Sequence, residues 1–276
     1  MATPLTIEPV PAEPLVRFDD IRIGFDDGDV LKGISFTVQP RETKVIIGES
    51  GSGKTVLLKL AAGLLRPDEG RVLVMGHDLT EMKEVDLLDF RRSLGFVFQE
   101  GALFDSLSVS ENVAFRLSQE GIAPEEIEMR VREVLRFVEL EEAYEKHPPE
   151  LSGGMRRRVS IARAIISRPP MVYYDSPTGG LDPVTSQTII TLILRLRDYV
   201  GATSLLATHR LQDAFGLASF EFDFKADRVI PIWDDPARTR PSATTFLVLK
   251  DGKIYFEGEP QELLKSEDEY LRQFLF

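Results

Sequence analysis

The chain has 276 residues, enough for one large α/β unit or two smaller domains, and 43% of them are hydrophobic. Its formal net charge of −12 argues against broad nucleic-acid binding, which needs a basic face. It has no cysteine, which excludes disulfides and thiolate metal sites, and no apolar run approaches the length of a membrane-spanning helix.

The N-terminal part of the chain changes character after residue 14. Residues 1–14 are proline-rich with little periodicity, and we expect a mobile leader there. Two strands should follow, near Val16–Phe25 and Leu31–Val38, with Asp26–Asp29 as the turn between them. Phe25 has two interpretations that the sequence leaves open, a core aromatic or a platform on which an adenine ring stacks.

A glycine-rich octapeptide follows the apolar run Val45–Ile47 and fits the phosphate-binding pattern G-x-x-x-x-G-K-[ST], the P-loop. Glycines let backbone N–H groups turn inward around phosphate oxygens, and the helix that begins near Lys54 adds its positive end. Lys54 can neutralise phosphate charge, and the Thr55 hydroxyl can ligate Mg²⁺. The predicted loop consists of Gly48, Glu49, Ser50, Gly51, Ser52, Gly53, Lys54 and Thr55.

Alternating strand and helix signals continue beyond the P-loop. We expect its helix to end at Gly63 and a strand near Arg71–Met75 to precede helical sequence. A short apolar strand at Leu94–Phe98 ends at Gln99. Apolar residues then recur at helical spacing and predict an amphipathic helix that faces the core, with Ile127, Val131, Val134, Leu135 and Val138.

A second helix start that could bind an anion lies at Leu151–Met155. Ser152, Gly153 and Gly154 open an arginine-rich helix, where free backbone N–H groups can face an anion. Such a tripeptide is by itself usually a turn with a cap. The presence of a P-loop in the same chain favours the anion-binding interpretation of this tripeptide.

Two further strands end in polar residues. Met171–Asp175 is an apolar strand that ends in an acid, the form expected of a Walker B element, where Asp175 would hold Mg²⁺ through its water shell. A tight loop with Asp182 comes before the next helix. Ser204–Ala207 is another strand, and His209 follows its end, where ligands gather in open parallel sheets.

Taken together, these motifs resemble the nucleotide-binding subunit of ABC transporters, from about Val16 to Phe274. The resemblance implies an α/β P-loop NTPase fold, with a RecA-like core, an N-terminal antiparallel β region and an inserted helical subdomain at about 100–165. A single domain would cover residues 15–276. An extra hairpin or loop at about 219–245, with an edge strand at Arg228–Trp233, a hairpin at Phe246–Phe256 and a C-terminal helix at about 260–276 would complete it.

The resemblance also implies that two copies of the chain sandwich two ATP molecules head to tail. Each P-loop would face a signature turn and a D-loop of the other copy, formed by Ser152, Gly153, Gly154 and Asp182. ATP would be bound by the P-loop and by Phe25. Mg²⁺ would be held by Thr55, Gln99 and Asp175. The positions implied in catalysis are Lys54, Gln99, Ser176 and His209.

A finer resemblance lies in Phe96–Phe104 and Val109–Phe115, which are similar to the ATPases of Mla/Mce-type lipid transport systems. The implied partners are an integral-membrane permease of the MlaE type and an MCE-domain lipid-binding protein, with no nucleic acid. The implied location is the cytoplasmic face of the inner membrane. Two alternatives remain: the ATPase of another ABC importer or exporter, and an ABC nucleotide switch without a channel.

The chain departs from the ABC family at Ser176, because the family normally has glutamate directly after the Walker B aspartate. A neutral hydroxyl cannot take a proton from water as a carboxylate does, and loss of a positioned base costs about 10²–10⁴ in rate. Three interpretations remain: a slow ATPase, a substitute group, or an engineered or degenerate site that binds ATP without useful hydrolysis. Arg210 also departs, where an acid is common.

Overall fold

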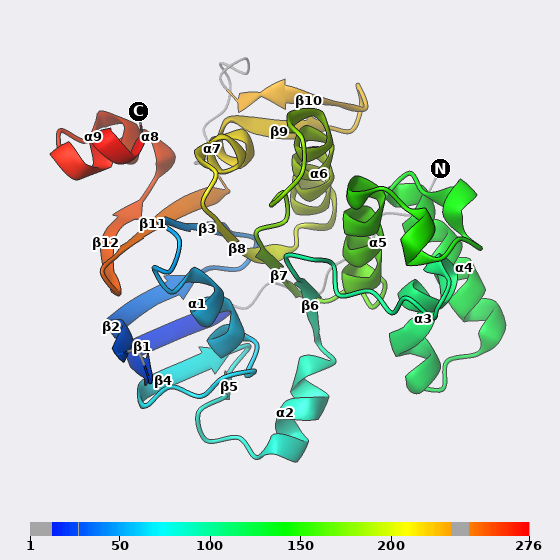
Figure 1. Cartoon of the computed structure of the whole chain (residues 1–276), viewed down its shortest axis with the longest axis horizontal. Helices are drawn as coiled ribbons and strands as arrows, with labels where there is room; N and C mark the ends of the chain where they lie inside the picture. Colours follow the sequence, from blue (N-terminus) through cyan, green and yellow to red (C-terminus); the bar gives the residue numbers. More distant parts are fainter. Residues whose placement is uncertain (1–12, 27, 233–242, 276) are drawn as a thin grey trace.

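The structure is a computed structural model that describes residues 13–26, 28–232 and 243–275 (Figure 1). The predicted mobile leader falls almost entirely outside these residues. So do Asp27 in the first predicted turn and the segment 233–242 of the predicted extra loop.

A four-stranded antiparallel sheet forms the N-terminal part, in the order β2-β1-β4-β5. Its apolar residues alternate along β1, so that Val16 and Phe18 are buried while Arg17 is exposed. The sequence therefore predicts β1, β2 and β4, but not the two-residue strand β5. Their bounds are Val16–Phe25 for β1, Gly28–Val38 for β2, Glu69–Val74 for β4 and His77–Asp78 for β5.

The second sheet has six strands in the order β12-β11-β3-β8-β7-β6. All neighbouring pairs are parallel except β11 and β12, which form the predicted hairpin around Asp251 and Gly252. The predicted parallel P-loop sheet is confirmed. The bounds are Thr43–Gly48 for β3, Leu94–Val97 for β6, Met171–Asp175 for β7, Thr203–Thr208 for β8, Thr244–Lys250 for β11 and Lys253–Gly258 for β12.

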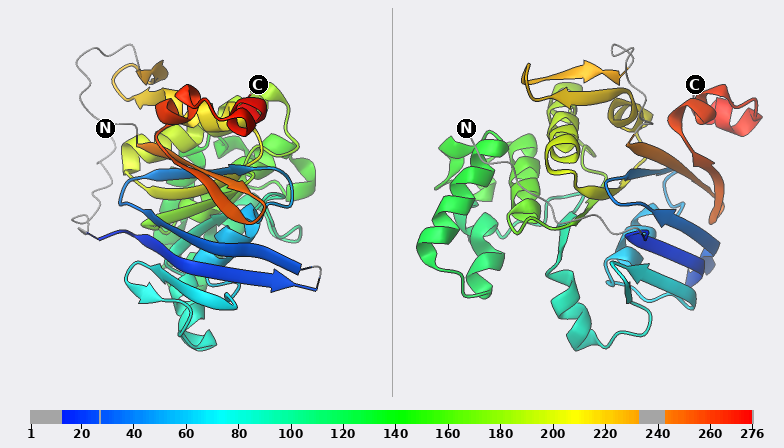
Figure 2. Two further views of the ribbon diagram at one scale, coloured as in Figure 1. Left: turned by 90° about the vertical axis from the view of Figure 1, so that its left-hand side faces the viewer. Right: turned by 180° about the vertical axis from the view of Figure 1, so that it is seen from behind.

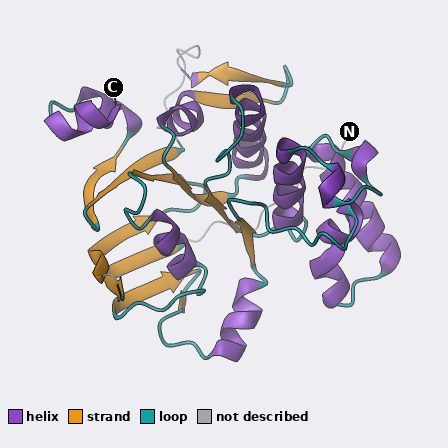
Figure 3. Cartoon of the chain, in the orientation of Figure 1, coloured by secondary structure: helices purple, strands orange, loops and turns teal. Residues whose placement is uncertain are grey.

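The helices fall into groups by position. Three helices between β6 and β7 gather at the end of the molecule opposite the antiparallel sheet (Figures 1 and 2); they are α3 (Val109–Gln119), α4 (Pro124–Phe137) and α5 (Gly153–Ile165). The others connect the strands, as Figure 3 shows. They are α1 (Lys54–Ala61), α2 (Glu84–Arg91), α6 (Pro183–Arg195) with the π-helical turn Leu196–Val200, and α7 (Leu211–Ser219).

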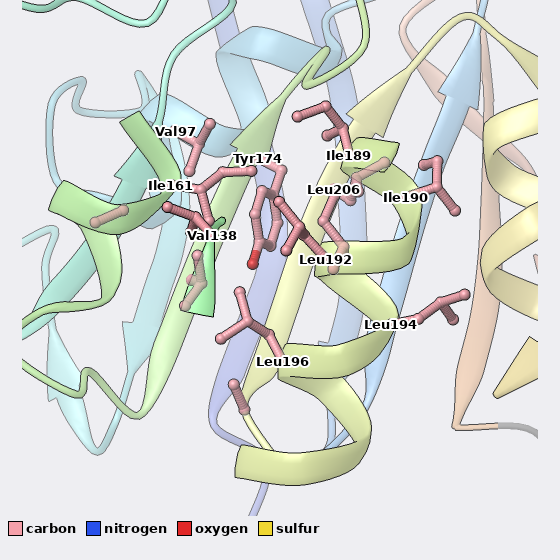
Figure 4. Close-up of a cluster of buried hydrophobic side chains, with 14 of the residues drawn as sticks. Val97, Val138, Ile161, Tyr174, Ile189, Ile190, Leu192, Leu194, Leu196 and Leu206 are labelled. Atoms are coloured by element: carbon pink, nitrogen blue, oxygen red, sulfur yellow. The ribbon is translucent and has the colours of Figure 1, made fainter. Parts of the chain in front are cut away.

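Both faces of the six-stranded sheet are buried. Successive residues of each strand point to opposite faces, so Val45 and Ile47 join one hydrophobic cluster while Ile46 joins the other. The first cluster lies against α3–α7, and part of it is drawn in Figure 4. The second lies between the sheet, α1 and the antiparallel sheet. This explains why the strands are continuously apolar in sequence.

The C-terminal third differs from the expectation in two places. The expected single helix at 260–276 is two helices, α8 (Pro260–Lys265) and α9 (Glu269–Leu275), because Ser266 is extended and Asp268 Oδ1 accepts a hydrogen bond from the N–H of Leu271 at 2.9 Å. The predicted edge strand near Arg228 pairs with β9 (Phe220–Asp223) as β10 (Arg228–Pro231), in a separate two-stranded sheet. The domain division itself stays a prediction.

Two adjacent tyrosines on β7 are fully buried on opposite faces of the sheet. The hydroxyl of Tyr173 donates to the carbonyl of Ala61 at 3.0 Å. The hydroxyl of Tyr174 (Figure 4) has no hydrogen-bond partner in the part of the chain that the structure describes. Burial raises the pKa of both phenols, so both are neutral. An unpaired buried hydroxyl costs free energy, whereas a paired one stabilises.

We therefore predict opposite effects of removing the two hydroxyls. Tyr173→Phe should lower the free energy of unfolding by about 1–2 kcal/mol, because the Ala61 carbonyl loses its donor. Tyr174→Phe should leave the free energy of unfolding unchanged or raise it by about 1 kcal/mol. Urea unfolding of the two variants measures both values. A clear loss of stability in Tyr174→Phe would contradict the prediction.

Candidate functional site

The P-loop connects β3 to α1 and is shaped by close packing. Gly53, at the start of α1, has φ 98°, and a Cβ atom there would lie 2.6 Å from Leu31 Cδ2, so only glycine fits. Glu49, Ser50 and Gly51 are exposed. Together with Ser52 they line one side of a cavity of about 290 Å³, whose other walls come from β2, the β11–β12 turn and α9.

Lys54 is almost buried, at 9% exposure, and its amine points back into the loop. Its Nζ donates to the carbonyls of Gly48 at 2.8 Å and Glu49 at 2.7 Å. Burial lowers the pKa of Lys54, while the charges of Asp175 and Glu49 act in the opposite direction. A poorly solvated cation among backbone groups favours an incoming anion such as a phosphate.

Thr55 and Asp175 come together from different elements. Thr55 Oγ1, in the first turn of α1, donates to Asp175 Oδ1 at the end of β7 over 3.0 Å. Burial raises the pKa of Asp175, and the hydrogen bond from Thr55 opposes that effect. A bound cation would oppose it further.

This hydroxyl–carboxylate pair fits Mg²⁺, which prefers oxygen ligands and keeps several waters or phosphate oxygens. Among the described residues, no group of three or more His, Cys, Asp or Glu side chains could hold a metal ion. An ion at Thr55 and Asp175 would therefore take its remaining ligands from the amide of Gln99, from water or from nucleotide, as expected where Mg²⁺ arrives with a phosphate chain.

Ser176 directly follows Asp175 and is held rigidly by its backbone. Its N–H donates to the carbonyl of Ala207 at 2.8 Å, and its carbonyl accepts from the N–H of Gly179 at 2.9 Å. The residue is 8% exposed and has φ 44°. The position where the ABC family normally carries glutamate is thus fixed in place and carries a hydroxyl.

Three other predicted site residues are solvent-exposed. Gln99 follows β6 and His209 follows β8, so both lie at the carboxyl end of the parallel strands, where β3 and β7 also end. Phe25, at the end of β1, is 50% exposed and does not belong to either buried cluster. The core interpretation of Phe25 is therefore wrong, and its stacking role stays a prediction.

The predicted signature turn and D-loop each cap the helix that follows them. Ser152 caps α5, its Oγ accepting from the N–H of Met155 at 3.2 Å. Asp182 caps α6, accepting from the N–H groups of Val184 and Thr185, each at 3.0 Å. The pKa of Asp182 is lowered, chiefly because its carboxylate accepts a hydrogen bond from the Thr185 hydroxyl. Gly153 and Gly154 form the first turn of α5.

The signature turn does not join the P-loop of its own chain. Strands β8 and β7 separate β3 from β6, and α5 packs beside β6. The two helices lie on opposite faces of the sheet, since Leu57 of α1 belongs to one hydrophobic cluster and Val159 of α5 to the other.

Sequence reasoning missed two buried arginine contacts. Arg157 is 6% exposed, and its guanidinium donates to the carbonyl of Phe98 at 2.7 Å. Arg210 donates to the Thr178 carbonyl at 3.2 Å and to Ser186 Oγ at 2.8 Å. Arg157 belongs to a run of three arginines, and Arg210 registered only as a departure from the family, so neither pattern singled out its partners.

A buried carboxylate anchors the same loop. Asp213, in α7, accepts a hydrogen bond from the Thr178 hydroxyl and lies 3.6 Å from the guanidinium of Arg210. Burial raises the pKa of Asp213, and the hydrogen bond from Thr178 opposes it. The loop from Ser176 to Asp182 is therefore fastened to the start of α7, directly after His209.

This fold and site define a P-loop protein that has the features of a nucleotide-binding cassette. A family model described as "ABC transporter" matches residues 31–179, and the chain belongs to the ABC transporter family. An ATP-binding cassette solved as a dimer in a post-hydrolysis state with ADP and Pi superimposes with a TM-score of 0.73 and 29% identity, over 88% of this chain and 98% of that one.

Two relatives of this chain serve different transport systems, as their names state. The methionine import ATP-binding protein MetN of Rhizobium johnstonii is 38% identical over 219 residues, which are 79% of this chain but only 60% of MetN. The intermembrane phospholipid transport system ATP-binding protein MlaF of Haemophilus influenzae is 33% identical over 265 residues, 95% of this chain and 90% of MlaF. Among the described residues of this chain, no helix is long and apolar enough to cross a membrane.

The contact between α5 and α6 generates a prediction. A Cβ atom on Gly154 would collide with Cγ2 of Thr185, so Gly154→Ala should lower the free energy of unfolding by about 1–3 kcal/mol. Thr185→Ser removes that methyl group and keeps the hydroxyl that bonds Asp182.

In the double variant Gly154→Ala/Thr185→Ser, the loss measured by urea unfolding should therefore be smaller than the sum of the two single losses. Strict additivity would contradict the contact.

Proposed function

We propose that this chain is the ATP-binding subunit of a membrane transporter and that it binds ATP with Mg²⁺ and hydrolyses the ATP to power transport. The observation that carries the proposal is the cluster of Lys54, Thr55 and Asp175 beneath the P-loop. It combines a buried ammonium, a hydroxyl and a carboxylate around the N-terminal end of one helix. These are the groups that a triphosphate with Mg²⁺ requires.

In this proposal, Lys54 leaves the loop carbonyls to neutralise phosphate charge, while Thr55 and Asp175 hold Mg²⁺ with Gln99. The ion supplies charge neutralisation on the phosphate oxygens. Phe25 stacks on the adenine ring, for which its exposure leaves room. His209 and Gln99 orient the attacking water from the carboxyl end of the parallel strands.

We further propose that two copies act together, each supplying Ser152, Gly153, Gly154 and Asp182 to the nucleotide held by the other. The positions of the two motifs support this, because α1 and α5, whose first turns carry them, lie on opposite faces of the sheet of one chain. The solved relative with ADP and Pi is itself a dimer.

For the cargo, we propose phospholipid or another hydrophobic molecule, carried with an MlaE-type permease and an MCE-domain partner. This chain would lie at the cytoplasmic face of the inner membrane, attached through the permease. The match to MlaF extends over 90% of that relative, whereas the match to MetN leaves 40% of MetN unmatched. The second candidate is import of a small solute such as methionine, which the higher identity to MetN favours.

The surface that would meet the permease is the segment after Gln99. Phe104 is 43% exposed and Phe115 is 40% exposed, with ring centroids 4.8 Å apart. Arg163 fixes the backbone below them by donating to the carbonyls of Ala102 at 2.7 Å and Gly101 at 2.9 Å. An exposed aromatic pair on a fixed loop suits a helix of a membrane subunit.

Ser176 leads us to propose slow hydrolysis, since no carboxylate follows Asp175 in the sequence. Ser176→Glu should raise the single-turnover rate of ATP hydrolysis by about 10²–10⁴-fold. Ser176→Gln, which has the same length and no basic carboxylate, should not raise it. Lys54→Ala should abolish ATP binding. This variant therefore gives the background rate of ATP hydrolysis in the assay. An unchanged rate in Ser176→Glu would instead point to a substitute group.

The cargo proposal predicts which permease stimulates the ATPase. In proteoliposomes, an MlaE-type permease should increase ATP hydrolysis by this chain and move labelled phospholipid, and Phe104→Ala should reduce both. The matched control is a methionine-import permease with labelled methionine. Stimulation by that permease alone would overturn the lipid assignment and leave the ATPase assignment intact.

A further inference from the structure

A second cavity, of about 430 Å³, lies away from the P-loop. Its walls come from α4, from the link between α5 and β7, from the π-helical turn Leu196–Val200 and from the β9–β10 turn. The volume is that of a small-molecule pocket. The inner surface is mostly apolar and includes Val134, Ile166, Val172, Leu196, Val200 and Ala202.

Four arginines line this cavity, Arg130, Arg136, Arg168 and Arg195, together with two acids, Glu133 and Asp227. Three of these arginines also pair with Glu126, Glu139 and Glu141, which do not line the cavity, so the charges around its rim are mixed. Recognition of an anionic end of a ligand therefore depends on an arginine whose own carboxylate partners are loosely held.

Arg195 is the most strongly positioned of the four. Its guanidinium lies over the rings of Phe137 at 5.0 Å and Phe222 at 5.3 Å. Its side chain is 28% exposed, and its two carboxylate neighbours, Glu139 and Asp227, are 3.9 and 4.0 Å away, beyond hydrogen-bond range.

The other rim arginines have closer partners. Arg136 donates to Glu141 at 2.8 Å, Arg168 to Glu133 at 3.3 Å, and Arg130 to Glu126. The two aromatic rings thus hold the Arg195 guanidinium in place while its carboxylate neighbours contact it only loosely. A ligand carboxylate could approach closer than either and form a charge-assisted hydrogen bond.

We propose that this cavity binds a fatty acid, with the carboxylate on Arg195 and the acyl chain on the apolar inner surface. A carboxylate matches the planar guanidinium, and an unbranched chain fits a pocket whose lining offers mainly hydrophobic side chains. Because the walls come from both α4 and the β7 end of the sheet, the bound molecule fastens the helical region to the core. The proposal does not depend on nucleotide binding.

Decanoate binding to the full chain, measured by isothermal titration calorimetry, tests the proposal. Decanoate should bind and raise the melting temperature, whereas decanol, with the same chain and no charge, should bind much more weakly. Arg195→Gln should weaken decanoate binding about tenfold to a hundredfold, the range for loss of a charge-assisted hydrogen bond. The matched control is Arg132→Gln on α4, which does not line the cavity and should bind decanoate normally.

A second variant fills the pocket. Val134 is half-buried and lines the cavity, so Val134→Phe should block decanoate without removing a charge. Circular dichroism melting checks that each variant folds. The proposal is overturned if decanoate does not bind, if decanol binds equally well, or if Arg195→Gln and Arg132→Gln bind decanoate alike.

Discussion

The hydrogen bond from Thr55 to Asp175 is the contact on which the site depends. It joins residues 120 positions apart, and it exists because β3 and β7 are parallel strands of one sheet with only β8 between them. In a parallel sheet, the carboxyl ends of all strands lie at the same end of the sheet. Every predicted nucleotide contact except Phe25 and the trans motifs follows one of these ends.

Burial shifts the pKa values of the charged groups at this end of the sheet. The pKa of Lys54 is lowered and that of Asp175 is raised, in each case chiefly by loss of solvent. An incoming anion would favour the charged form of Lys54, and an incoming cation would favour the charged form of Asp175. In the proposed function, nucleotide and Mg²⁺ would therefore each offset one of the two burial effects.

The loops that carry Ser176 and Asp182 are fixed by charges from elsewhere in the fold. Arg157 reaches from α5 to the carbonyl of Gly179 at 3.4 Å, and Arg210 and Asp213 reach from the start of α7 to Thr178. The segment that directly follows His209 is therefore fastened to the loop that leads to Asp182. If the rate of hydrolysis is limited by the hydroxyl at position 176, this rigid frame is what remains to orient water and phosphate.

The sequence by itself determined the P-loop, most strands and the order of the motifs, because strand periodicity and glycine spacing are local properties. The parallel sheet and the arrangement of the fold were implied by the resemblance to the ABC family. The sequence could not decide that Phe25 is exposed, that the C-terminal segment breaks into α8 and α9, or that β9 and β10 pair apart from the main sheet. Nor could it identify the contacts that Arg157, Arg195 and Arg210 make. Their partners lie many residues away, and only the tertiary structure sets which distant groups share a low-dielectric environment.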